Sequence, residues 1–132
     1  AEQVKIEVGA AMTEIENPPA DFAVQGRDLM SGIPKEVFVS YVEIAHCLDK
    51  SISKIEEAIL NALEMTPPEL AADIYRTGIY MAGGGSLLRG LDKRISLKTK
   101  LPVHVCEDPL RAVARGTGIA LKNVHKFPFL IK

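Results

Sequence analysis

The apolar residues of this chain follow a helical spacing in some segments and an alternating spacing in others. Helical spacing appears first in residues 1–8, which are predicted to form a helix. It returns after residue 40, where five apolar positions recur every three or four residues on one helical face: Leu48, Ile52, Ile55, Ile59 and Leu63. Ser40 and Glu43 have the spacing of a capping box, so we expect this helix to begin at once after Ser40. The polar residues 49–51 leave open whether it is one helix or two.

Alternating spacing marks two segments between these helices. Phe22 and Val24, and later Val37, Val39 and Tyr41, alternate with mostly polar neighbours, which predicts two half-buried strands. The intervening residues 31–34 (Ser-Gly-Ile-Pro) are typical of a turn. We therefore expect a hairpin with a longer loop.

In the second half of the chain, helices and strands take turns. Thr66 is the expected cap of a helix that begins with two prolines and ends at Gly78. Residues 79–82 read as a buried strand, and a helix is expected from about residue 86 to 98. A second strand is predicted over residues 101–105, and a last helix from residue 108 to about 122. This order predicts two parallel strands with a right-handed crossover, which need cover on both faces and so belong to a larger sheet.

Composition narrows the class of protein. The chain has 132 residues, is 47% hydrophobic and 25% charged, and carries a formal net charge of −1. This balance gives no basic surface for a nucleic acid, and no apolar run reaches the roughly 20 residues that span a bilayer. Cys47 and Cys106 stand alone, which favours buried thiols in a reducing, cytoplasmic setting.

The glycine triplet Gly83-Gly84-Gly85 is the strongest candidate for binding chemistry. It follows a predicted parallel strand and precedes a predicted helix, at the sheet edge where α/β proteins bind ligands and where free backbone amides favour phosphate. The alternative is a tight turn without a ligand, and position alone does not decide between the two. The segment is not a P-loop, because Leu91-Asp92 replaces the required Lys-Ser/Thr, and Leu88 breaks the dinucleotide pattern.

The remaining features favour packing over chemistry. Ala112, Gly116 and Ala120 recur every four residues, which favours close packing of the last helix on a neighbour over ligand contact. The three histidines and two cysteines have no metal-ligand spacing, so no metal site is expected. The apolar residues 127–131 are expected to dock on another domain, with a membrane or partner contact as the alternative.

Several segments together resemble the MreB family of rod shape-determining proteins, the bacterial homologues of actin. The resemblance rests on these stretches: residues 1–9, 26–29 with 32–35, 66–70, 78–92, 101–103, 107–110 and 112–118. It is weakest over residues 10–23 and after residue 123. The combination is specific, whereas the triple glycine alone would not be.

The resemblance implies an α/β chain that forms part of an actin-like (ribonuclease H-like) ATPase fold, as the C-terminal portion of the protein. Residues 1–65 would be the smaller outer subdomain of the second domain, with a hairpin and helices, and residues 1–9 its nucleotide-side helix. Residues 66–108 would be the C-terminal half of the inner subdomain, with the parallel βαβα unit. Residues 109–132 would return to the first domain.

The resemblance also implies a function. Family members bind ATP or ADP with Mg and polymerise into filaments on the inner face of the cell membrane, in the cytoplasm. These filaments direct cell-wall synthesis and rod shape, together with cell-wall synthesis and membrane proteins of the rod-shape complex. Gly83, Gly84 and Gly85 would line the ribose and phosphates, Glu2 and Lys5 would border the adenine and ribose, and Ser86 and Leu88 would lie beside the adenine.

The family's phosphate-binding hairpins do not occur in these 132 residues, so this chain alone is expected to be inactive and to hold no nucleotide. Two alternatives remain. One is a non-catalytic interaction or assembly module whose glycines are structural. The other is a chaperone or cell-division ATPase of the actin superfamily.

Overall fold

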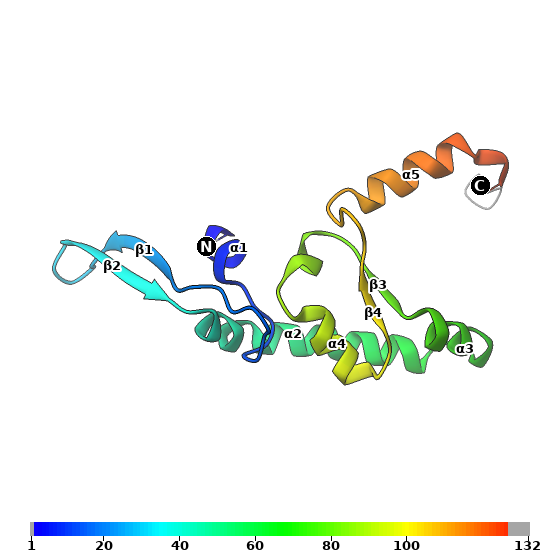
Figure 1. Cartoon of the computed structure of the whole chain (residues 1–132), viewed down its shortest axis with the longest axis horizontal. Helices are drawn as coiled ribbons and strands as arrows, with labels where there is room; N and C mark the ends of the chain where they lie inside the picture. Colours follow the sequence, from blue (N-terminus) through cyan, green and yellow to red (C-terminus); the bar gives the residue numbers. More distant parts are fainter. Residues whose placement is uncertain (1, 127–132) are drawn as a thin grey trace.

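The computed structural model describes residues 2–126 as an elongated arrangement of helices around two separate two-stranded sheets (Figure 1). Helix α1 (Glu2–Val8) ends as predicted, next to Gly9. Strands β1 (Phe22–Arg27) and β2 (Pro34–Val39) form the predicted antiparallel hairpin, with Phe22 opposite Val39. The hairpin makes one end of the molecule.

A single helix, α2 (Tyr41–Glu64), runs from the hairpin to the opposite end of the molecule (Figure 1). The capping box is confirmed: the Ser40 side chain accepts from the Glu43 amide, and the Glu43 carboxylate accepts from the Ser40 amide. The predicted apolar face is confirmed at Ile52 but wrong at Ile55, which is 48% exposed. The buried stripe instead includes Ala45 and the charged residue Glu56.

Helix α3 (Pro68–Thr77) begins without the predicted threonine cap. The residue before a proline is pushed into an extended conformation, and Pro67, which precedes Pro68, has ψ 144°. The cap position therefore falls on Pro67, which has no side-chain oxygen to offer. The Thr66 hydroxyl instead donates to the Ala62 carbonyl at the end of α2.

Strands β3 (Ile79–Met81) and β4 (Val103–Val105) are parallel and in register, as predicted. Ile79, Met81 and Val103 pack against the core, whereas Tyr80 is 66% exposed and lies beside His104. The prediction of a fully buried strand is therefore wrong, because within the described residues only one face of this sheet is covered.

Two helices begin later than the sequence predicts. After the glycines comes a short 3-10 helix, η1 (Gly84–Leu87), and α4 (Leu91–Thr99) starts only beyond Gly90. Leu88 is extended and Gly90 has φ +76°, so the backbone cannot continue as one helix from residue 86. Helix α5 (Ala112–Lys122) begins four residues beyond Asp108, which itself has φ +48°, and η2 (Val124–Lys126) follows.

The core is small and lies where α2, α4 and the segment after α1 meet. Its buried members are Ala11, Ile52, Leu91 and Ile95. The chain exposes 9999 Å², whereas a compact protein of 14.4 kDa exposes about 6,800 Å². Among the described cysteines Cys47 is exposed, so the expectation of two buried thiols is wrong for it. Over residues 2–126, no helix is both long and apolar enough to cross a membrane.

Candidate functional site

The glycine turn, residues 83–86, lies directly beyond the carboxyl end of β3, at the edge predicted for a ligand. Gly83 has φ +82°, a conformation that favours glycine, and its amide donates to the Pro109 carbonyl at 2.7 Å. The Gly83 carbonyl accepts from the Ser86 hydroxyl at 2.7 Å and from the Ser86 amide at 3.2 Å. Ser86 is 5% exposed, so its hydroxyl serves the turn itself.

The three glycines have different reasons to lack a side chain. Gly83 needs its positive φ, and a β-carbon on Gly84 would lie 3.2 Å from Leu110 Cδ2. A β-carbon on Gly85 would meet nothing within 4 Å, and its φ is not in the left-handed region. Packing among the described residues therefore does not explain Gly85. The turn presents open backbone at a sheet edge, which is what close approach of a ligand needs.

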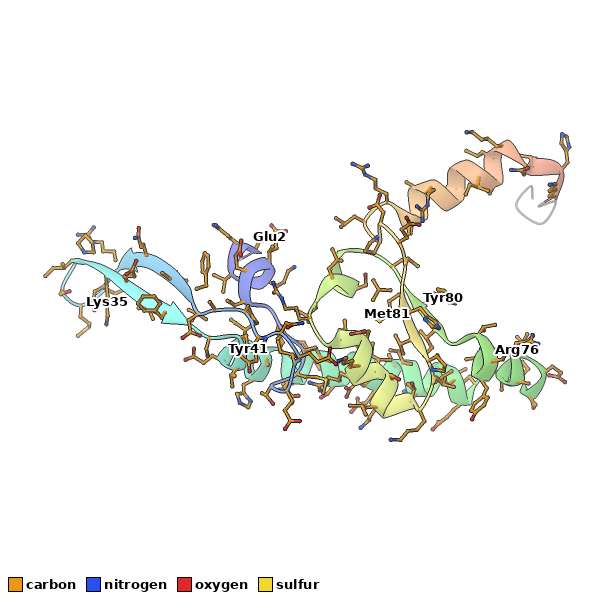
Figure 2. All side chains as sticks on the ribbon, viewed as in Figure 1. Glu2, Lys35, Tyr41, Arg76, Tyr80 and Met81 are labelled. Carbon is orange, nitrogen blue, oxygen red and sulfur yellow. The ribbon has the colours of Figure 1, made fainter. Side chains whose placement is uncertain are left out.

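Helix α1 carries the other two predicted contacts, Glu2 and Lys5, and both are exposed. Figure 2 shows Glu2 at the outer end of α1. The structure joins the inner end of α1 to the segment after the glycines, since the Ala11 amide donates to the Arg89 carbonyl at 2.8 Å. Across residues 2–126 no hydrogen bond links Glu2 or Lys5 to the glycine triplet 83–85.

Leu88 lies at this contact between the end of α1 and the segment after the glycine turn. A β-carbon on Gly9 would lie 3.0 Å from Leu88 Cδ1 and 2.1 Å from the Lys5 carbonyl oxygen, so Gly9 is a glycine that close approach requires. Leu88 is partly buried and also packs against the hydrophobic core. The role beside the adenine stays a prediction.

Sequence reasoning missed a partly buried charge cluster around Arg94 on α4. Arg94 Nε donates to Glu56 Oε1 at 2.6 Å, and Nη1 donates to Asp49 Oδ1 at 2.8 Å and to the Ala11 carbonyl at 3.0 Å. Glu56 is 7% exposed, and its bond to Arg94 is the largest cause of a raised pKa for that guanidinium. The sequence feature that could have revealed this cluster is the position of Glu56, four residues after Ile52 and therefore on the buried face of α2.

A groove of about 350 Å³ lies beside this cluster. It is lined by residues 11–14 and by Ala45, His46, Asp49 and Arg94, none of which belongs to the glycine turn. In the described part of the chain, no group of three or more metal-ligating side chains could hold a metal ion. The glycine turn with α1 is therefore the candidate site. The Arg94 cluster holds the segment after α1 in place through the Ala11 carbonyl.

Comparison with known proteins identifies relatives of this arrangement. The family model described as MreB/Mbl protein matches residues 1–128. The chain is 40% identical over 128 residues to the cell shape-determining protein Mbl of Bacillus subtilis, covering 97% of this chain and 38% of Mbl. It is 42% identical over 124 residues to the cell shape-determining protein MreB of Escherichia coli, covering 94% of this chain and 35% of MreB. The chain thus spans little more than a third of the curated relatives it matches.

Solved structures of known proteins are also similar to this chain. MreB5 of Spiroplasma citri bound to ADP superposes with a TM-score of 0.86 at 40% identity, covering 95% of this chain and 37% of MreB5. A structure of MreB5 bound to AMPPNP gives 0.85. A non-polymerising mutant of MamK gives 0.63 at 23% identity over 83% of this chain and 32% of MamK, which supports the fold alone. These neighbours confirm the predicted actin-like fold.

Proposed function

The chain belongs to the MreB/Mbl family, and from that membership we propose that it supplies part of the nucleotide site and part of the assembly surface of a bacterial actin-like cytoskeletal protein. In a protein of the relatives' length, this chain would bind ATP or ADP and polymerise into filaments that direct cell-wall synthesis and rod shape. Filament protomers, rod-shape complex proteins and the inner face of the membrane are the proposed partners, with the cytoplasm as the proposed location.

The observation that carries the nucleotide proposal is the open glycine turn. Gly85 is not needed for packing or for backbone geometry among the described residues, yet it stands at the sheet edge where phosphates bind. Solved relatives at 40% identity are bound to ADP and AMPPNP. Glu2, Lys5, Ser86 and Leu88 complete the proposed site, although Ser86 would act mainly by shaping the turn through its bond to Gly83.

We also propose the division into residues 1–65, 66–108 and 109–132, and α5 supports its last boundary. This helix extends away from the rest of the molecule (Figure 1), and Val113 on it is 73% exposed. A β-carbon on Gly116 would meet nothing within 4 Å. We propose that the small-residue stripe of α5 packs on the first domain. The tail 127–131, with its proposed docking role, lies outside the described residues.

Hydrolysis would need groups from elsewhere in the protein. Phosphoryl transfer depends on a metal ion and electrostatic groups placed around the phosphates, and residues 2–126 offer no cluster of metal ligands. We propose that Mg and the β- and γ-phosphates are held by segments beyond this chain, so that the chain alone is inactive.

The assembly proposal rests on the two ends of the molecule. The hairpin loop presents Leu29 and Met30, which are 98% and 97% exposed, beside the ion pair of Lys35 with Asp28. At the opposite end, the α2–α3 corner presents Met65 and Leu70, which are 85% and 55% exposed. Figure 2 shows Lys35 near one end and Arg76, on α3, near the other. Exposed apolar groups at opposite ends suit a head-to-tail contact, which propagates into a filament.

Calorimetric titration of Mg-ATP tests the nucleotide proposal. The samples are this chain alone and a chimera in which it replaces the corresponding segment of Spiroplasma citri MreB5. We expect binding only by the chimera. A Gly85→Asp substitution in the chimera should weaken that binding at least about tenfold, because a carboxylate would face the phosphates.

Gly26→Asp is the matched control, since a β-carbon on Gly26 also meets nothing within 4 Å and Gly26 lies in the distant hairpin. A folded chimera that fails to bind Mg-ATP would overturn the nucleotide proposal. Equal affinities for the wild-type and Gly85→Asp chimeras would make the glycine turn structural and favour the interaction-module alternative.

A further inference from the structure

We propose that Arg89 is a positioning residue that joins the two parts of the nucleotide site, holding α1 at a fixed place relative to the glycine turn. This inference rests on the proposed function, because it assumes that α1 and the turn face one nucleotide. The guanidinium acts on the backbone of α1 and has no contact with the ligand in this proposal.

Helix α1 contacts β1 and α2, and its buried attachment to the rest of the chain lies at its carboxyl end. It has seven residues, too short to be stable by itself in water. Five of them are exposed, including Ile6 at 63%, and only Val8 is fully buried. Contacts at the carboxyl end therefore help to fix the position of α1, because Val8, Gly9, Ala10 and Ala11 form a continuous buried stretch there.

Arg89 engages that end with both its side chain and its backbone. Its Nη1 donates to the Ile6 carbonyl at 3.1 Å and lies 3.4 Å from the Gly9 carbonyl. Its carbonyl accepts from the Ala11 amide at 2.8 Å, and Ala10 pairs with Arg89 in a parallel bridge. The last carbonyls of a helix lack partners within the helix, and a cation there is favoured by the helix dipole.

The same residue is tied to the glycine turn through a short run of backbone. The Leu88 amide donates to the Gly85 carbonyl at 3.1 Å, so the residue before Arg89 is bonded to the last glycine of the triplet. Leu88 itself packs on Gly9. A displacement of the turn is thereby passed to Arg89, and from Arg89 to the carbonyls of α1.

The consequence is a preorganised site. Glu2 and Lys5 on α1 and the open backbone of the turn belong to segments about 80 residues apart in sequence, and the Arg89 contacts bridge that separation directly. Ligand contacts on separate elements bind well only if those elements are held in place before the ligand arrives. Loss of the guanidinium should leave the turn intact and free α1 to move.

The test compares Arg89→Ala, Arg89→Lys and Arg76→Ala in the MreB5 chimera, by calorimetric titration of Mg-ATP and by amide hydrogen exchange with and without Mg-ATP. Removal of a charged hydrogen-bond donor should weaken binding about tenfold in Arg89→Ala. Lysine keeps a cation that can donate to these carbonyls, so Arg89→Lys should recover much of the loss. Arg76 forms an exposed ion pair with Asp73 on α3, and its removal controls for the change in charge.

Hydrogen exchange separates positioning from general destabilisation. In the wild-type chimera, Mg-ATP should slow exchange in both α1 and residues 83–88. In Arg89→Ala, saturating Mg-ATP should still protect residues 83–88 while protection of α1 is lost.

The proposal is overturned if Arg89→Ala binds like the wild type, if Arg89→Lys is as weak as Arg89→Ala, or if α1 stays protected in Arg89→Ala. Failure of the wild-type chimera to bind would instead refute the proposed function. If Arg89→Ala does not fold, Arg89→Lys alone decides. The proposal then requires its affinity for Mg-ATP and its α1 protection to lie close to those of the wild type, and a clear loss of either would overturn it.

Discussion

At the scale of single residues, the buried charge of Glu56 does more to hold the structure together than the exposed ion pairs do. Its carboxylate lies against Arg94, which also binds Asp49, Ser53 and the Ala11 carbonyl. One guanidinium thus ties α2, α4 and the segment after α1 together. Loss of Glu56 would leave the largely buried Arg94 guanidinium with the exposed carboxylate of Asp49 as its remaining charged partner.

Replacement of Glu56 by alanine should therefore destabilise the chain by about 2 kcal/mol, since Arg94 loses its most buried partner but keeps Asp49. Urea unfolding followed by circular dichroism measures the change. Glu16→Ala is the matched control, because Glu16 pairs with Lys93 at the surface, and little or no change is expected. A cost for Glu56→Ala no larger than that of the control would show that the Arg94 cluster does not support the fold.

At the scale of elements, the start of α2 is determined locally by four residues. Ser40 and Glu43 satisfy each other's amides, and α2 begins directly after Ser40. The backbone amide of Ser40, followed by its side chain, holds the pKa of the Glu43 carboxyl below its ordinary value of 4.5. A depressed carboxyl pKa contributes stability above the unfolded pKa, and that contribution is lost as the pH falls through the folded pKa.

Ser40→Ala should accordingly cost about 1 kcal/mol, because an N-cap hydroxyl is removed. The substitution should also raise the Glu43 pKa toward its ordinary value, as one donor to the carboxylate disappears. Carbon-detected NMR titration of the Glu43 carboxyl follows the pKa, and hydrogen exchange at residues 41–44 follows fraying of α2. An unchanged Glu43 pKa would contradict this account.

At the scale of the whole molecule, the amount of exposed surface is the main feature. The chain exposes about 3,000 Å² more than a compact protein of its mass. The excess includes apolar side chains on the hairpin loop, the α2–α3 corner and α5, such as Leu29, Met65 and Leu121. Exposed apolar surface of this extent is typical of contact sites.

The slope of urea unfolding reports the surface that folding buries. For this chain alone we expect a slope well below that of a compact 132-residue domain, because few residues leave water on folding. Equilibrium unfolding followed by circular dichroism gives the slope directly. A steep, cooperative transition typical of a compact domain would mean that the isolated chain rearranges to bury its exposed surfaces.

Head-to-tail assembly makes a separate prediction about the two ends. In the MreB5 chimera, replacing Leu29 and Met30 together by serine should raise the concentration needed for Mg-ATP-dependent polymerisation, measured by sedimentation, with nucleotide affinity unchanged. Replacing Met65 and Leu70 by serine should do the same, since the two ends would face each other. Leu97→Ser on α4, which is 60% exposed and lies away from both ends, controls for surface polarity. Polymerisation at the wild-type concentration by both double variants would refute the proposed contact.

Local chemistry was readable from the sequence because it needs only nearby residues. The capping box at Ser40, the hairpin, the end of α3 at Gly78 and the parallel pairing of β3 with β4 were all predicted and are confirmed. So was the actin-like fold, through the motifs of the MreB family. The cap, the hairpin and the helix end depend on turn chemistry, capping or apolar spacing within a few residues. The pairing of β3 with β4 follows from the order of strands and helices.

Other features depended on partners distant in the sequence. Nothing near Glu56 in the sequence indicates its partner Arg94, which α4 brings to it from 38 positions away. Nothing near Arg89 indicates its contact with the carbonyls of α1. The sequence alone determined which segments form helices and strands and which family the protein belongs to, although two helices begin later than it predicts. Tertiary structure alone decided which charges are buried, which glycine is open and how α1 meets the glycine turn, because burial and contact arise only when distant segments are packed together.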